Sequence, residues 1–446
     1  MKSFYNKFNV LNTALLSKRR RVGISQSRPA VSSLSQDKIL ILQGPVGPFF
    51  RNLQRCFELT GFITKRVIFH SADALFSKHS NTVRFSGSLS EWESWLSTEL
   101  TTNRPKAIVL FGSNRPAHRI AHNLAEKFGV PVVALEEGYL RSGYISCELG
   151  GNNQRSPLND WKQDRNNQSA CKPLPVHFSF VMMCIWGATY YLVRDFTKKT
   201  SETVLYHRQT RGILKEAVAW ISHMTRRLFF KVKEKSTIDK LTNHSRKHYV
   251  LIPLQAPDDA QIHFNSRGWD NRKLVLGCLN ALHIVKTEDI LVFKTHPLDE
   301  NSHILIAQLW KEAQSLGLTE RVIVLQSGKL SILAKHSSGM IVINSTSGFS
   351  ALHHQIPLLV LGSAVFRKPS IVTVGDEQAS IVKFLEERSL KCQQTISAFI
   401  NSVKSEALLP GDFYALTTQR ITANHVVRYV QSVIEEKANL HEATEQ

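Results

Sequence analysis

The stretch KILILQGPVGPFF, residues 38–50, decides the fold class. Its first half is a short run of β-branched and other apolar residues, which is typical of a buried strand. Two glycines follow, and apolar residues then recur at helical spacing until Gly61. A strand, a glycine-rich loop and a helix in this order predict the start of a Rossmann-like α/β unit.

The same alternation continues on both sides of a polar middle section. We expect strands at residues 38–43, 65–70, 107–112, 248–255, 290–297, 322–326 and 339–344, and a strand that runs into a polar loop at residues 131–141. We expect helices at residues 89–100, 117–128, 271–283, 301–316, 329–336 and 417–437. Strands that alternate with helices form parallel sheets. The pattern therefore predicts an α/β protein with two Rossmann-like domains facing across a cleft, a GT-B-like plan, with a helical basic insertion.

Composition shifts divide the chain into five expected segments. They are a basic, disordered tail (1–37), an N-terminal Rossmann-like domain (38–150), a linker with a basic helical segment (151–247), a C-terminal Rossmann-like domain (248–415), and a C-terminal helix and tail (416–446). The tail has no acidic residue before Asp37 and no cleavage site of a secretory signal.

Charge is the unusual feature of the composition. Lys and Arg number 56 against 36 Asp and Glu, which gives a formal net charge of +20. Such a surplus indicates a polyanionic neighbour: nucleic acid, an anionic membrane face or phosphorylated substrates. No nucleic-acid-binding signature is present, so we do not expect nucleic acid. The six cysteines are scattered, with no CxxC pair, which indicates a reducing compartment.

The longest apolar run is FSFVMMCIWGATYYLV, residues 178–193. It is shorter than the roughly 20 residues that a membrane span needs, and Ser179, Gly187 and Thr189 interrupt it. We expect a buried core helix here, and the alternative is a helix that lies in a membrane interface. The basic stretch at residues 226–247 is a second candidate for a membrane-facing surface.

Four loops follow expected strands, where open α/β sheets bind ligands. The first holds Gly44 and Gly47, which suit either close approach of an anion or a plain tight turn. The second holds Glu136 and Glu137, followed by Arg141. Adjacent carboxylates suit general acid or base chemistry, and the alternative is a solvated acidic turn with Arg141 as its partner.

The third loop is QAPDDAQ, residues 255–261. A carboxylate of Asp258 or Asp259 suits a nucleophile, a base or an acceptor for sugar hydroxyls, and the flanking Gln255 and Gln261 suit hydroxyl recognition. A capped turn explains the same residues.

The fourth candidate is a pair of segments. Lys294 and His296 offer cationic donors for a phosphate or carboxylate, although His296 also fits a core histidine. Asn344, Ser345 and Ser347 stand at an expected helix start, which suits either a phosphate cradle or helix capping. No ligand spacing typical of a metal site occurs, so we expect no metal.

Five of these motifs appear in the order of a known family. GPVGPFF, LEEGYLRS, QAPDDAQIHFNS, FKTHPLDE and INSTSGFSALHHQIPLLVLG resemble segments of the bacterial capsule polysaccharide biosynthesis/export family, in its KpsS/LipB-type branch. The resemblance covers residues 38–390. It implies a retaining β-Kdo transferase that uses CMP-Kdo to start the Kdo linker of a capsule on a (lyso)phosphatidylglycerol lipid.

The resemblance also implies roles for individual residues. Asp259 matches the acidic position of the family's glutamine-flanked loop, but Asp258 stands where a small residue is expected, so the identity of the nucleophile stays open. Glu137 or Glu136 would transfer protons, and His296 would act beside Lys294 on the Kdo carboxylate and the departing phosphate. The residues implied in substrate binding are Gly44, Gly47, Arg141, Gln255, Gln261, Lys294, Asn344, Ser345 and Ser347.

The implied partners are CMP-Kdo, a phosphatidylglycerol-type acceptor, an anionic membrane surface and other capsule assembly and export proteins. The implied location is the cytoplasmic face of the bacterial inner membrane, and no cofactor is required. Two alternatives stay open. One is a GT-B-like transferase that uses another sugar nucleotide, and the other is a non-catalytic component of capsule export.

Overall fold

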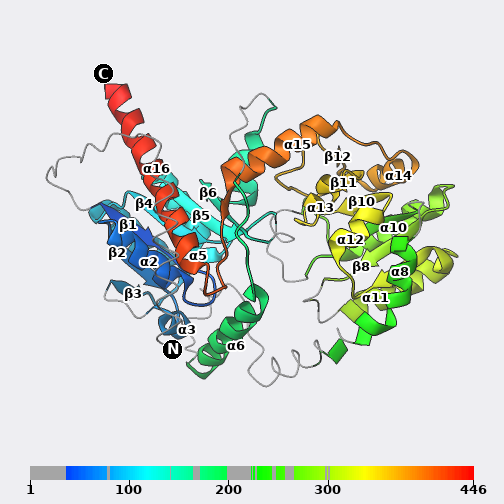
Figure 1. Cartoon of the computed structure of the whole chain (residues 1–446), viewed down its shortest axis with the longest axis horizontal. Coiled ribbons are helices and arrows are strands. Elements are labelled where there is room, and N and C mark those ends of the chain that lie inside the picture. Colours follow the sequence, from blue (N-terminus) through cyan, green and yellow to red (C-terminus); the bar gives the residue numbers. More distant parts are fainter. Residues whose placement is uncertain are drawn as a thin grey trace, which may run out of the picture. The chain divides into compact units, whose positions relative to one another are not determined.

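A computed structural model gives the fold of residues 37–77, 81–140, 142–163, 171–197, 222, 225–226, 229–243, 248–256, 266–296, 299 and 302–445 (Figure 1). The basic tail that we expect to be disordered lies outside these residues.

A seven-stranded sheet forms the first half of the fold. Its strand order is β13-β6-β5-β4-β1-β2-β3, and every pairing is parallel except those of β6. The strands are β1 (Lys38–Ile41), β2 (Ile63–Ile68), β3 (Thr82–Arg84), β4 (Ala107–Phe111), β5 (Val132–Glu137), β6 (Tyr144–Leu149) and β13 (Leu408–Pro410). The helices around it are α2 (Phe49–Leu59), α3 (Ser71–Leu75), α4 (Leu89–Thr102), α5 (Pro116–Lys127) and α16 (Gln419–Glu445).

Alternate residues of β1 enter two separate cores. Ile39 and Ile41 pack with the apolar residues of α2 and α16, whereas Leu40 and Leu42 pack with those of α4 and α5. Successive side chains of a strand point to opposite faces, so an uninterrupted apolar strand requires helices on both sides. The result is a three-layer α/β/α sandwich.

A six-stranded parallel sheet forms the second half, with the order β12-β11-β10-β7-β8-β9. Its strands are β7 (Tyr249–Pro253), β8 (Ile290–Lys294), β9 (Val322–Leu325), β10 (Gly339–Val342), β11 (Leu358–Val360) and β12 (Thr373–Val374). Its helices are α8 (Lys235–Asn243), α10 (Asn271–Ile284), α11 (Ser302–Ser315), α12 (Leu330–His336), α13 (Gly348–His353), α14 (Gln378–Glu386) and α15 (Gln393–Ser402), with the short helix η4 (Thr319–Arg321). Two cores again cover the two faces.

The chain returns to the first sheet after α15. A π-helical turn, η5 (Val403–Ala407), leads into β13, which pairs with β6 in antiparallel register. Helix α16 then packs along α2, as the red and blue helices of Figure 1 show. Residues 408–410 therefore belong to the first sheet, although the expected second domain extends to residue 415.

The first part of the polar middle section contains local structure that its composition does not predict. Two short 3-10 helices, η1 (Asn153–Arg155) and η2 (Pro157–Asp160), lie there, and Leu158 and Trp161 enter the core of the second sheet. Residues 171–177 have no regular secondary structure, as expected for a loop. Helix α6 (Ser179–Thr197) covers the long apolar run. The prediction of a buried core helix is wrong, because six large apolar side chains between Phe178 and Phe196 are exposed. No helix within the described residues has the length and hydropathy that a membrane crossing requires.

The predicted α/β class, with two parallel-dominated sheets, is confirmed. Both sheets have the strand order of a Rossmann fold, in which the first and fourth strands are neighbours at the point where the winding reverses. In the first sheet these neighbours are β1 and β4, and in the second they are β7 and β10. Ligands bind at this switch point, outside the carboxyl ends of the strands.

Burial of His118 on α5 predicts acid sensitivity. Its side chain is fully buried, its Nδ1 lies 2.9 Å from the Gly112 carbonyl oxygen, and desolvation lowers its pKa to about 3. The unfolded chain binds a proton near pH 6.5, so stability is full above that value and falls on acidification. His118→Gln should reduce the loss of unfolding free energy between pH 7 and pH 5 by about 2 kcal/mol in guanidinium titrations.

The matched control is His303→Gln, because His303 is exposed on α11. This variant should keep the pH dependence of the unmodified protein. An identical pH dependence in His118→Gln and in the unmodified protein would contradict a neutral, buried His118.

Candidate functional site

Polar residues gather at the switch point of the second sheet. Gln255 follows β7 and Asn344 follows β10, so both lie at the carboxyl edge of neighbouring strands. The Asn271 side chain, at the start of α10, holds Gln255 by its backbone. Its Oδ1 accepts from the Gln255 N–H at 3.1 Å, and its Nδ2 donates to the Gln255 carbonyl at 2.7 Å. These two hydrogen bonds fix the direction in which the chain leaves β7.

The residues predicted to follow Gln255 in the site, Asp258, Asp259 and Gln261, lie outside the described residues, as does Arg141. The structure therefore leaves their roles as predictions.

The segment after β10 is a tight hydroxyl-rich turn. The Ser347 hydroxyl donates to Ser345 Oγ at 2.8 Å, and the Ser347 N–H approaches the same oxygen at 3.3 Å. Helix α13 begins at Gly348, where a Cβ atom would lie 2.6 Å from the Phe366 ring. Glycine is required there by close packing. The turn therefore carries two serine hydroxyls and the buried side-chain amide of Asn344 in one short segment of sequence.

Lys294 is the last residue of β8 and is buried. Its ammonium donates to the carbonyl oxygens of Thr295 at 3.0 Å and Gln326 at 3.3 Å. The sequence predicts a cationic donor at this edge, and the structure adds that backbone oxygens hold the ammonium in place. His296 follows as a half-buried residue whose backbone carbonyl accepts from Asp299.

A buried glutamate fixes the neighbouring loop, and sequence reasoning missed it. The Glu234 carboxylate accepts from the N–H groups of Gln326 at 3.0 Å and Ser327 at 2.8 Å, and from the Ser327 hydroxyl at 2.7 Å. Arg226 donates to the Gln326 side chain at 2.8 Å. Part of the basic stretch at residues 226–247 therefore supports the loop after β9. An acidic residue isolated among lysines is the signal that would have found Glu234.

Glu136 and Glu137 end β5 at the carboxyl edge of the first sheet, and both are half-buried. As consecutive strand residues, they direct their side chains to opposite faces. Asn153 Nδ2 donates to Glu136 Oε2 at 3.1 Å. The two carboxylates therefore occupy different surroundings despite their adjacency in sequence.

A third carboxylate, Glu148 on β6, organises the loops behind this edge. It is fully buried and accepts hydrogen bonds from the Tyr139 hydroxyl at 2.7 Å, Asn152 Nδ2 at 2.9 Å and the Ser156 hydroxyl. Desolvation raises the pKa of Glu148, and these three donors oppose that rise. The Tyr139 hydroxyl also accepts from the Asn153 N–H at 3.0 Å. Glu148 thereby holds the residue that contacts Glu136.

Tyr139 also connects the two candidate loops. Its ring stacks on Phe349 of α13, with centroids 5.7 Å apart and an interplanar angle of 28°. Both rings belong to one buried core. The turn after Glu137 therefore contacts the helix that starts directly after the serine turn. Neither aromatic residue was singled out from the sequence.

The switch point of the first sheet lies at Gly44. The guanidinium of Arg115, which follows β4, donates to the Gly44 carbonyl at 3.0 Å and to Gln43 Oε1 at 3.1 Å. Gln43 Nε2 in turn donates to the buried Asp73 carboxylate at 3.0 Å. Gly44 and Gly47 are required by packing, because a Cβ atom would lie 2.4 Å from the Phe50 ring and 2.9 Å from the Trp186 ring.

Among the residues that the structure describes, no group of three or more His, Cys, Asp and Glu side chains is arranged to hold a metal ion. The cysteines in this part of the chain are all free thiols.

Comparison with known proteins adds a family and relatives. The model of a family described as capsule polysaccharide biosynthesis protein matches residues 106–414. The capsule polysaccharide export protein KpsS of Escherichia coli is 29% identical over 75% of this chain and 86% of its own length. The capsule polysaccharide modification protein LipB of Neisseria meningitidis serogroup B is 27% identical over 85% of this chain and 92% of its own.

Among solved structures, the β-Kdo 2,7 transferase of KpsC from Thermosulfurimonas dismutans matches with a TM-score of 0.41 and 12% sequence identity. The match covers 88% of this chain and 99% of that one.

The Glu148 network predicts a large effect of its removal. Glu148→Ala leaves three buried donors without an acceptor, so the free energy of unfolding should fall by about 3 kcal/mol. Glu148→Gln keeps the shape and an acceptor oxygen, and should cost about 1 kcal/mol. Guanidinium unfolding measures the free energy of unfolding of both variants. The control is Glu320→Ala, at an exposed position, which should stay within about 0.5 kcal/mol of the unmodified protein. Equal midpoints for Glu148→Ala and the control would contradict the network.

Proposed function

Because the chain belongs to the capsule polysaccharide biosynthesis protein family, we propose that it is a retaining β-Kdo glycosyltransferase of GT-B-like plan. In this proposal it moves Kdo from CMP-Kdo to a (lyso)phosphatidylglycerol lipid and thereby starts the Kdo linker of a capsule. The relatives of the KpsS and LipB kind, which align over most of the chain, support the place in capsule biosynthesis and export.

The contact between Tyr139 and Phe349 is the observation that carries the proposal of a single active site. It links the turn after Glu137, which offers carboxylates, to the turn with Ser345 and Ser347, which offers hydroxyls. A transferase needs both kinds of group on one substrate, because it must hold a phosphate and move a proton.

We assign the donor to the switch point of the second sheet. Asn344, Ser345 and Ser347 would bind the phosphate of the cytidine nucleotide, and Gln255 and Gln261 would bind sugar hydroxyls. Gly44, Gly47 and Arg141 would contact substrate from the first half of the chain. This assignment uses polar groups at the carboxyl edges, where Rossmann-like sheets bind ligands.

The chemistry of Kdo explains why fixed positive charge is needed. Its anomeric carbon carries a carboxylate, so an oxocarbenium-like transition state forms beside a negative charge. Lys294 supplies a positive charge that two carbonyl oxygens hold at the edge of the sheet. We assign direct contact with the Kdo carboxylate and the leaving phosphate to His296. Preorganised charge of this kind stabilises a transition state without reorganisation.

Retention of configuration follows from two displacements. The Asp259 carboxylate attacks the anomeric carbon and CMP leaves with the bonding electrons. An acceptor hydroxyl then attacks the same carbon, gives its proton to Glu137 or Glu136, and releases Asp259. Retaining glycosidases use two carboxylates in the same way, which is an analogy of chemistry and not of fold. The nucleotide is already a good leaving group, so the proposal needs no metal and no cofactor.

The proposed setting is the cytoplasmic face of the bacterial inner membrane, where the protein would be peripheral. A net charge of +20 favours an anionic membrane surface, and other capsule assembly and export proteins would be further partners. The competing functions are a GT-B-like transferase for another sugar nucleotide and a non-catalytic export component.

Transfer of Kdo tests the proposal directly. CMP-Kdo generated in situ and a fluorescent lysophosphatidylglycerol analogue should give a product heavier by one Kdo, measured by mass spectrometry. Intact CMP-Kdo with folded protein would move the assignment to another donor or to a non-catalytic role. Turnover of a different sugar nucleotide under the same conditions would separate these two outcomes.

The identity of the nucleophile predicts unequal variants. Asp259→Asn should fold normally and lose transfer by about a thousandfold or more, because no covalent intermediate can form. Asp258→Asn is the matched control and should lose less than about tenfold. Circular dichroism checks the fold and initial rates of transfer give the comparison. Equal losses in the two variants would remove Asp259 from the role of nucleophile.

A further inference from the structure

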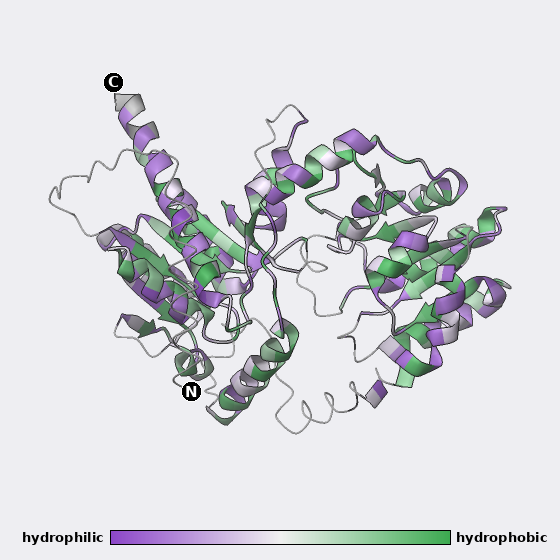
Figure 2. Ribbon diagram, viewed as in Figure 1, coloured by the Kyte–Doolittle hydropathy of each residue, from purple (hydrophilic) through white to green (hydrophobic). Residues whose placement is uncertain are grey.

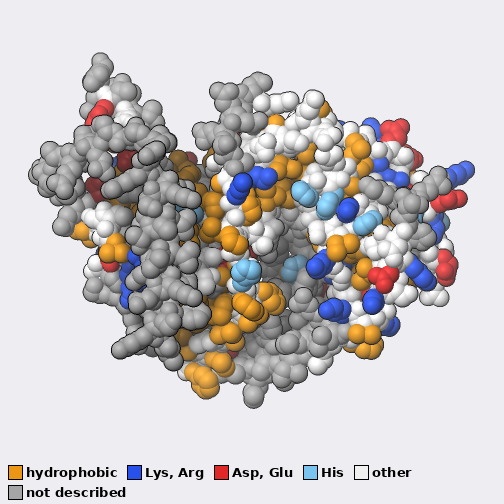
Figure 3. Space-filling view, in the orientation of Figure 1, with side chains coloured by type: hydrophobic (Ala, Val, Ile, Leu, Met, Phe, Trp, Pro, Cys, Tyr) orange, Lys and Arg blue, Asp and Glu red, His pale blue; other side chains and the backbone are white. Residues whose placement is uncertain are grey.

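Helix α6 presents an apolar face to solvent. Its exposed fractions are 51% for Val181, 47% for Ile185, 44% for Leu192 and 78% for Phe196. These positions recur at spacings of four and seven, so they share one face of the helix. Figure 2 colours much of α6 as hydrophobic, and Figure 3 shows hydrophobic side chains gathered over it in the lower part of the view.

The composition of this face departs from the usual surface of a protein. A helix packed on a soluble domain normally carries charged and polar residues on its outer side. Here every exposed residue from 178 to 197 is apolar except the last, namely Phe178, Phe180, Val181, Ile185, Ala188, Leu192, Phe196 and Thr197. A contiguous apolar patch of this kind marks an interaction surface.

The opposite face of α6 is anchored in the first half of the fold. The Tyr190 hydroxyl donates to the buried Asp73 carboxylate at 3.1 Å, and the Tyr190 ring stacks on His70. The Trp186 ring packs edge-on against Phe76, with centroids 5.7 Å apart. At the start of the helix, the Ser179 hydroxyl donates to Asp412 at 2.6 Å. The inner face of α6 therefore packs against the protein, and its outer face is open to a partner.

Charge and length identify the kind of partner. Within the segment from Lys172 to Lys199, Arg194 is buried and paired with Asp195 at 3.2 Å, so the remaining basic residues are the lysines that flank the helix, Lys172, Lys198 and Lys199. The whole chain carries +20. A basic sequence with an apolar helical face fits an anionic lipid surface, into which such a helix sinks parallel to the membrane plane. The described helix is not apolar enough to cross a bilayer. A surface contact therefore fits the helix better than a span.

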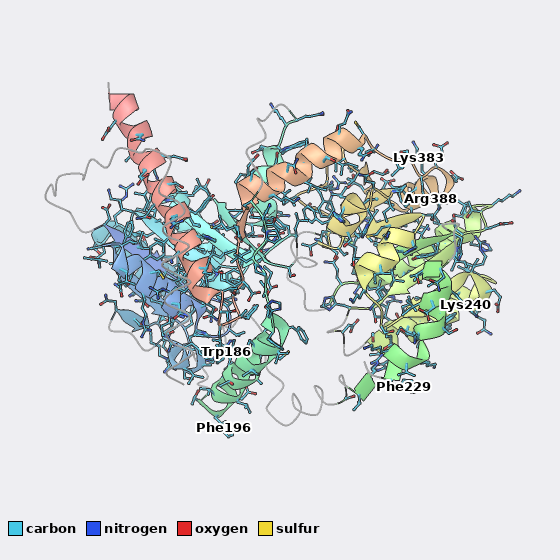
Figure 4. All side chains as sticks on the ribbon, in the orientation of Figure 1. Trp186, Phe196, Phe229, Lys240, Lys383 and Arg388 are labelled. Carbon is cyan, nitrogen blue, oxygen red and sulfur yellow. The ribbon has the colours of Figure 1, made fainter. Side chains whose placement is uncertain are left out.

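We propose that α6 inserts its outer face into the interface of an anionic lipid bilayer. This choice of occupant rests on the proposed function, in which the acceptor is a lipid. Figure 4 labels Trp186 and Phe196 on this helix. Because the Trp186 ring lies against Gly47, α6 adjoins the loop of Gly44 and Gly47 at the switch point of the first sheet. A bilayer bound at α6 would bring an amphiphilic acceptor to that loop.

Vesicle partition tests the proposal with matched variants of the full chain. The α6 variant combines Ile185→Ser, Leu192→Ser and Phe196→Ser. The control combines Leu59→Ser, Ile304→Ser and Leu416→Ser, whose side chains are 78%, 55% and 60% exposed outside α6. On vesicles of phosphatidylcholine with about one third phosphatidylglycerol, the α6 variant should lose at least about tenfold in partition, because three inserted apolar side chains are removed. The control should stay within about twofold.

Three outcomes would overturn the proposal. The first is equal partition of the α6 variant and the unmodified protein. The second is a dimer of the unmodified protein that the α6 variant breaks without a change in partition, which would make the face a contact between two copies. The third is a lower melting temperature of the α6 variant without a change in partition, which would mean that the chain itself covers the face.

A soluble assay separates this proposal from the proposed function. Transfer to a lysophosphatidylglycerol analogue below its micelle concentration should be unchanged in the α6 variant, since none of the three residues is assigned to the site. If the α6 variant loses partition and neither protein has transferase activity, the result would support the membrane contact of α6 and reject the proposed transferase function. If transfer is normal and partition is unchanged in the α6 variant, the result would support the transferase function and reject the membrane contact of α6.

Discussion

The pairing of β1 between β2 and β4 is the constraint on which the first half of the molecule depends. Every apolar residue from Ile39 to Leu42 is at most 2% exposed, and alternate residues serve two different cores. Burial on both faces forces helices onto both sides of the sheet, and the parallel direction gathers the loops after each strand at one edge. The position of Gln43 and Gly44 at that edge follows from this pairing, and so does their contact with Arg115.

Buried polar groups then decide how the loops at the edge are held. Asp73 accepts from Gln43, from Tyr190 and from the Phe69 N–H, while Glu148 accepts from Tyr139, Asn152 and Ser156. A buried carboxylate is costly unless it is hydrogen-bonded, so each of these groups requires its donors to stay in place. The same hydrogen bonds set the positions of the loop residues that donate them, which suits a site that must hold charge in fixed positions.

Much of the fold was predictable because periodicity reports burial directly. The expected strand at residues 107–112 and the expected helix at 271–283 match β4 and α10 to within one residue, whereas the expected strand at 290–297 starts with β8 but extends beyond its end at Lys294. Short edge elements such as β3, β12 and β13 were missed, because a strand of two or three residues carries no periodic signal. The candidate site was predictable as a set of loops, since polar residues after buried strands converge. The partners of Lys294 and Glu136 were not, because Gln326 and Asn153 come from other loops.

The sequence by itself determined the α/β class, two sheets that are mainly parallel, the polar loops at their carboxyl edges and the family. Each of these follows from local pattern and order along the chain. The tertiary structure alone decided that α6 exposes its apolar face, that Tyr139 stacks on Phe349, and that residues 408–410 join the first sheet. Hydropathy states that a side chain prefers burial, but only the packed neighbours determine whether that preference is met. For α6, the neighbours cover Trp186 and Tyr190 on one face and leave Ile185 and Phe196 exposed on the other.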